Sequence, residues 1–160
     1  MEHALVGALA RPTTASKLKE LEVPMRTKNY LTSDDVAKML AAARSEAIKN
    51  KWKVTIAIVD DAGVLLSLER LDGARPLTVE VATGKARTAA LMAQPTKVWE
   101  ERIKDQPNYL KFPLPLPMQG GLPIIYQGEC VGGVGAAGVK AEFDEQIAAV
   151  AIAALMSSLS

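Results

Sequence analysis

The sequence predicts an α+β domain, an antiparallel sheet of about four to five strands with helices packed on it. Two pairs of short apolar runs, within residues 54–69 and 122–134, are each joined by a tight turn that contains glycine. This spacing is typical of β-hairpins. Helical patterns precede, separate and follow the two hairpins. The order α-β-β-α-α-β-β-α favours a layered α+β architecture over a doubly wound one.

The length of 160 residues predicts one domain, which we place at residues 31–160 after an N-terminal arm at residues 1–30. The arm lacks a sustained period. It is expected either to lie on the body or on a neighbouring subunit, or to be disordered. The net charge of +1 gives no electrostatic signal for nucleic acid.

Targeting and redox signals favour the cytoplasm. The single cysteine, Cys130, cannot form an internal disulfide, which fits a reducing compartment. No apolar run reaches the roughly 18 residues of a membrane span, and the N-terminus does not have the pattern of a signal peptide. We therefore expect a cytoplasmic protein that binds no membrane.

The first body helix is expected over residues 33–49. Thr32 and Asp35 have the spacing of a capping box. The apolar positions that follow fall on one helical face: Val36, Leu40, Ala43 and Ala47. Residues 54–59 and 64–69 then form the first hairpin around a turn at Asp60–Gly63.

A second helix is expected over residues 77–92, with Pro76 suited to its start. Its predicted narrow face consists of Val81, Gly84, Thr88 and Leu91. Pro95 ends it, and Thr96 is positioned to cap a shorter helix through Ile103. Residues 106–117 are expected to be irregular. The alternating prolines forbid helix and central strand, so residues 112–118 should form an extended rim segment.

The second hairpin, residues 122–134, leads into a glycine-rich strand and a last helix over 142–159. Interior glycines such as Gly133 and Gly135 mark a place where a ligand or another backbone approaches closely. Residues 133–138 fit G-x-G-x-x-G. The dinucleotide interpretation also needs a further parallel strand, and none follows. Asp144 and Glu145 are expected to stabilise the start of the last helix.

Lys85, Arg70 and Asp72 are the candidate catalytic residues. Lys85 stands among small residues, where a lysine can act as acid, base or anion clamp; the alternative is a snorkelling surface side chain. Arg70 can grip a carboxylate, or it can form an ordinary surface pair with Asp72. Gly120 and Gly121 offer backbone N–H groups for an anion, or simply a turn. No metal site is expected, because His3 is the only histidine.

Five signatures in sequence order resemble the GlcG/HbpS-like haem-degrading family, to which the C-terminal domain of PduO-type proteins also belongs. They are Val59–Gly63, Arg70–Ala74, Gly84–Ala89, Gly120–Ile124 and Gly132–Gly135, the last followed by Asp144–Glu145. The resemblance covers residues 31–158. It implies a layered fold of five strands with helices, a homo-oligomer, and haem as a cofactor in some members.

Three functions follow from these observations. The first is a small-ligand-binding protein that takes haem or a related tetrapyrrole in a pocket between the glycine strand, the Lys85 helix and the loop after Arg70. The second is a cofactor-independent isomerase, tautomerase or hydrolase for a small carboxylated metabolite, with Lys85 as acid/base and Arg70 as anchor. The third is a structural module that forms oligomers. The candidates for a haem iron ligand are Tyr109, Tyr126, Met118 and Lys85.

Overall fold

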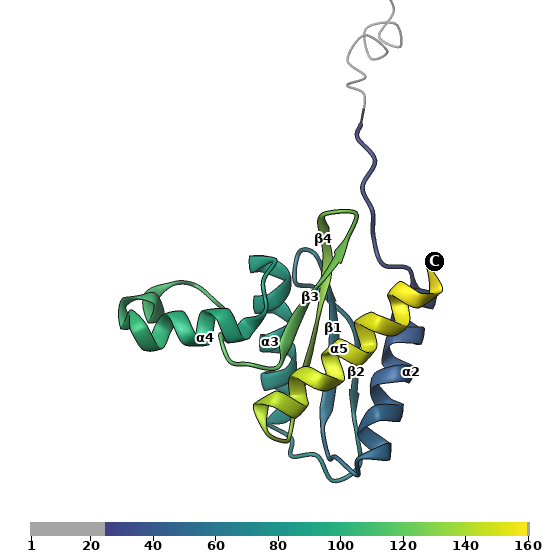
Figure 1. Cartoon of the computed structure of the whole chain (residues 1–160), viewed down its shortest axis with the longest axis horizontal. Helices are drawn as coiled ribbons and strands as arrows, with labels where there is room; N and C mark the ends of the chain where they lie inside the picture. The colour runs from purple at the N-terminus through teal and green to yellow at the C-terminus, as the bar shows by residue number, and fades with distance from the viewer. Residues whose placement is uncertain (1–24, 160) are drawn as a thin grey trace, which may run out of the picture.

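The computed structural model describes residues 25–159, and its centre is one antiparallel sheet (Figure 1). The strands are β1 (Thr55–Asp60), β2 (Leu65–Arg70), β3 (Gly121–Tyr126) and β4 (Glu129–Ala137). They are ordered β2-β1-β4-β3, so the two predicted hairpins meet through β1 and β4. The predicted α+β class is confirmed, and the sheet among the described residues has four of the four to five strands expected.

Helices cover both faces of the sheet. Helices α2 (Ser33–Lys49) and α5 (Ala141–Ser158) pack on one face, over a core that includes Ile56, Ile58 and Ile124. Helix α3 (Thr78–Met92) covers the other face. Helix α4 (Thr96–Asp105) and the 3₁₀ helix η1 (Pro107–Lys111) project to one side of this body (Figure 1). The segment expected to be irregular thus contains one short helix, because Pro107 stands in its first turn, where no N–H is needed. Residues 1–24 of the predicted arm, and with them His3, lie outside the described residues.

The two predicted helix starts that depend on threonine have different outcomes. The capping box at Thr32 is confirmed: its hydroxyl accepts a hydrogen bond from the Asp35 N–H at 3.2 Å, and the Asp35 carboxylate accepts one from the Thr32 N–H at 3.0 Å. The cap expected from Thr96 is wrong. Its hydroxyl instead accepts from the Gly121 N–H at 2.9 Å and donates to the Gly121 carbonyl at 3.2 Å. Thr96 thus ties α4 to β3.

The predicted narrow face of α3 is wrong in part. Thr88 is buried as expected, but Leu91 is 47% exposed. The helix also buries a row of mostly small residues: Ala82, Lys85, Ala86, Ala89 and Ala90. The physical reason is the partner surface. Strand β4 presents glycines there, and only small side chains let the two backbones come together.

The glycines of β4 permit this contact between α3 and the sheet. A Cβ added at Gly133 would overlap the Ala86 carbonyl oxygen, and one added at Gly135 would overlap the Ala82 carbonyl oxygen. The close approach expected at these glycines is therefore made by a helix of the same chain. No helix among the described residues has the length and apolarity needed to cross a membrane.

Candidate functional site

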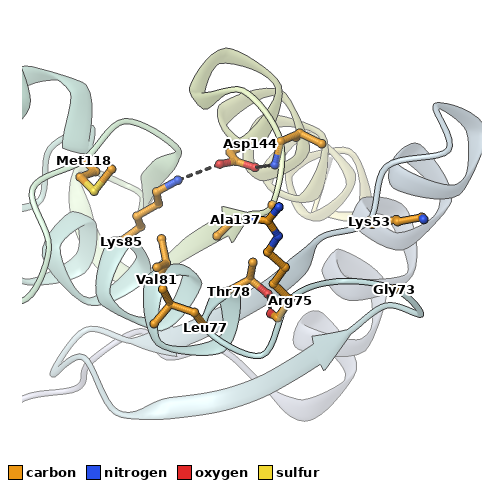
Figure 2. Close-up of a pocket in the computed structure, with 12 residues that line it drawn as sticks. Lys53, Gly73, Arg75, Leu77, Thr78, Val81, Lys85, Met118, Ala137 and Asp144 are labelled. Atoms are coloured by element: carbon orange, nitrogen blue, oxygen red, sulfur yellow. Dashed lines mark hydrogen bonds and ion pairs between the residues drawn. The ribbon is translucent and has the colours of Figure 1, made fainter.

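A cavity of about 540 Å³ opens between α3, the end of β4 and the loop at residues 71–77 (Figure 2). This is the position at which the sequence predicts a pocket. The volume is within the usual range for small-molecule sites, roughly 300–1,000 Å³. The residues that line it are Lys53, Gly73, Arg75, Leu77, Thr78, Val81, Lys85, Met118, Ala137, Gly138, Val139 and Asp144.

A buried ion pair forms one wall of the cavity. The Lys85 Nζ lies 2.8 Å from the Asp144 Oδ2, and each side chain is only 4% exposed (Figure 2). Lys85 also donates a hydrogen bond to the Ala136 carbonyl at 3.0 Å, and the other Asp144 oxygen accepts one from the Val139 N–H at 3.3 Å. Burial raises the pKa of Asp144, while the hydrogen bond and the charge of Lys85 oppose that rise.

Two glycines make room for this pair. Gly120 has a φ of +118°, and a Cβ there would lie 2.8 Å from both the Lys85 Nζ and the Asp144 Cβ. A Cβ at Gly121 would lie 2.5 Å from the Lys85 carbonyl oxygen. The N–H of Gly121 is already bonded to the Thr96 hydroxyl. In this structure, therefore, the two glycines allow close packing around Lys85.

The cavity also contains two cationic side chains without acidic partners. Within residues 25–159, neither Arg75 nor Lys53 forms a side-chain hydrogen bond or an ion pair. Figure 2 shows Arg75 extending from the loop before α3 toward the end of β4. Apolar side chains line the same cavity, among them Leu77, which is 70% exposed, and Met118, which is 49% exposed. Unpaired cations beside apolar surface suit a ligand that is both anionic and apolar.

The structure brings only part of the predicted site together. Lys85 lines the cavity, but Arg70 and Asp72 are exposed and do not line it. Arg70 ends β2 opposite Thr55. The arginine in the cavity is Arg75, from the loop that follows.

Sequence reasoning missed Asp144, which was expected only to favour the start of the last helix. A sequence signal was present. If Asp144 is position i, the positions i+3, i+4, i+7 and i+11 lie on the same helical face and are all buried: Ile147, Ala148, Ala151 and Leu155. An acid on the apolar face of a helix requires a partner inside the protein.

The candidate iron ligands separate clearly. Met118 and Lys85 line the cavity, whereas Tyr109 and Tyr126 do not. The ring of Tyr109 packs edge-on against Trp99, and Tyr126 is the last residue of β3. Among residues 25–159, no three histidine, cysteine, aspartate or glutamate side chains are grouped so that they could hold a metal ion.

Comparison with known proteins identifies the relatives of this fold. The model of the family described as "Haem degrading protein HbpS-like" matches residues 31–153. Protein GlcG of Escherichia coli K12 is 38% identical over 112 residues, which cover 69% of this chain and 84% of GlcG.

Two solved structures agree with this. The crystal structure of HbpS is 34% identical, with a TM-score of 0.76 over 81% of this chain and 92% of HbpS. The crystal structure of a PduOC:heme complex is 28% identical, with a TM-score of 0.72 over 79% of this chain and 95% of its own. From the sequence match and the shared architecture, the chain belongs to the HbpS-like family, whose model carries the description given above.

Proposed function

We propose that this protein binds haem or a related tetrapyrrole in the cavity beside α3. One observation carries the proposal: two unpaired cations, Arg75 and Lys53, share the cavity with apolar side chains. A tetrapyrrole combines a flat apolar ring with carboxylate side groups, so it matches both kinds of surface. The relative solved as a PduOC:heme complex supports this choice over other anionic apolar ligands.

The side chains in the cavity fit haem in three respects: charge, apolar contact and a ligand for iron. Arg75 can hold a propionate carboxylate through two parallel hydrogen bonds, and Lys53 adds a second positive charge. Leu77 and Val81 supply apolar contact for the ring. Bound haem would supply an iron centre, and the thioether of Met118 is the neutral soft ligand available for it in the cavity.

The test is a titration of the full chain with haem, followed by the Soret absorption band. We expect one site per chain, and Arg75→Gln should weaken binding about tenfold or more, the effect of losing a hydrogen bond to a charged group. Arg87→Gln is the matched control, because Arg87 is an exposed arginine on α3 outside the cavity. Unchanged affinity in Arg75→Gln, or no saturable binding by the wild type, would contradict the proposal.

The role of Met118 is separable from that of the cations. Met118→Leu keeps the apolar volume and removes the sulfur. If the thioether binds iron, this change alters the haem spectrum and leaves the affinity for iron-free protoporphyrin unchanged. Equal loss of both ligands would show that Met118 contributes only apolar contact.

A further inference from the structure

We propose that Lys85 and Asp144 form an acid–base dyad that moves a proton between oxygen and carbon of a small enolisable carboxylate, a 2-oxo acid. This activity is separate from tetrapyrrole binding and does not rest on it. Lys85 and Asp144 line the cavity, but the binding of an anion there does not require them. Because Lys85 and Asp144 neutralise each other, they add almost no net charge for holding a ligand.

The geometry suits proton transfer. The Nζ and Oδ2 atoms lie 2.8 Å apart, which is within direct hydrogen-bond distance, and both residues line the cavity. The remaining fixed contacts, to the Ala136 carbonyl and the Val139 N–H, hold the two side chains in place. Burial raises the pKa of Asp144, which makes its carboxylate a stronger base.

The same cavity supplies an anchor for the substrate. The guanidinium of Arg75 is unpaired among the described residues, and it can hold a carboxylate in a bidentate grip. Lys53 provides a second positive charge at the same opening. A carboxylate held there places the adjoining carbons of a short substrate between the anchor and the dyad. The substrate class is therefore small, anionic and enolisable.

The proton balance closes without a cofactor. In the enol-to-keto direction, the enol O–H gives its proton to the Asp144 carboxylate as the C=O bond forms. The electrons of the C=C bond take a proton from the Lys85 ammonium and form the new C–H bond. The dyad is then a neutral amine beside a neutral carboxyl group. One proton crosses from Oδ2 to Nζ along their hydrogen bond, and this restores the starting ion pair.

The experiment measures the reverse direction on the full chain. The protein is placed in D₂O with 2-oxobutyrate or phenylpyruvate, and proton NMR follows the replacement of hydrogen by deuterium at C3. We expect the wild type to exceed the buffer rate. Lys85→Met/Asp144→Asn should lose at least about 100-fold of that acceleration, the lower range for general acid–base catalysis. The asparagine still offers an oxygen to the Val139 N–H, and melting temperature reports whether the variant folds.

A second variant keeps the proposal falsifiable if the double variant does not fold. Arg75→Gln alters an exposed side chain and should raise KM for the 2-oxo acid, whereas Arg87→Gln should not. The proposal is overturned if the wild type matches the buffer rate with both probes. It is also overturned if a folded double variant keeps the acceleration, or if Arg75→Gln leaves KM unchanged. Haem titration of the same samples tests tetrapyrrole binding separately, so either proposal can fail alone.

Discussion

At the scale of single residues, the Lys85–Asp144 pair combines a site with a structural constraint. Removing two charges from water costs several kcal/mol for each ion, so a buried pair adds little net stability. Breaking it by removing one partner is costly, because the other charge stays buried without compensation. Gly120 is part of the same constraint, because the Lys85 and Asp144 side chains occupy the space that a Cβ at position 120 would need.

The first prediction concerns Lys85→Met. It leaves the Asp144 carboxylate buried and unpaired, so we expect a loss of about 3–5 kcal/mol in the free energy of unfolding at neutral pH. Lys85→Met/Asp144→Asn removes both charges and should recover part of this loss. Urea denaturation of the three proteins measures the differences. Unchanged stability in Lys85→Met would show that water reaches the carboxylate.

The pH dependence of that variant has a defined sign. In the wild type the folded-state pKa of Asp144 is already raised, and loss of the opposing Lys85 raises it further. A raised carboxyl pKa means that the folded state binds the proton more tightly than the unfolded state, whose value is about 3.9. The contribution of Asp144 to the free energy of unfolding is therefore fully present below the unfolded-state pKa. It is lost as pH rises through the folded-state pKa. Lys85→Met should approach wild-type stability on acidification, and the opposite trend would reject the assignment.

At the scale of elements, the contact between α3 and β4 consists of backbone against backbone. A Cβ at Gly135 would lie 2.6 Å from the Ala86 nitrogen, in addition to its overlap with the Ala82 carbonyl. Neither is the end of a flexible side chain, so the helix must move as a unit. That helix carries Lys85, and its displacement would also widen the cavity.

The second prediction follows from this contact. Gly135→Ala should destabilise the protein by about 3 kcal/mol, the upper range for overpacking. Gly128→Ala is the comparison. Gly128 lies in the β3–β4 turn with no atom within 4 Å of an added Cβ, so only its positive φ opposes the change, at roughly 1 kcal/mol. Melting temperature distinguishes the two. Equal effects would mean that α3 yields easily to an added methyl group.

The elements themselves were predictable because their signals are local. The cap at Thr32, the glycine turns and the prolines act within a few residues, and they placed helices and hairpins near their observed bounds. The helix face and the Lys85 partner depend on distant residues. Lys85 on α3 and Asp144 on α5 are 59 positions apart. No local sequence pattern predicts that the two helices bring these side chains together. The sequence analysis chose Arg70 and not Arg75, because the path of the loop between them decides which arginine lines the cavity.

At the scale of the whole molecule, the expectation of a homo-oligomer needs a new physical basis. The family resemblance implied it, and glycine-rich strands with alanine-rich helix faces are also suited to close contact between subunits. Here, however, α3 and β4 bury these surfaces against each other. One surface that still exposes apolar side chains is the projecting lobe formed by α4 and η1 (Figure 1). Its aromatic cluster, in which the Trp99 and Phe112 rings stack 5.8 Å apart, leaves Phe112 48% exposed.

The third prediction is that this lobe forms the interface with a second copy of the chain. Leu110 is 69% exposed and Val98 is 37% exposed, and a projecting element with such side chains gains stability when a partner covers them. Light scattering after size exclusion should give a multiple of the 17.1 kDa chain mass. Leu110→Asp should shift the particle toward 17.1 kDa, whereas Val64→Asp, at a 60% exposed apolar position in the β1–β2 turn, should not. A 17.1 kDa particle for the wild type at micromolar concentration would contradict the prediction.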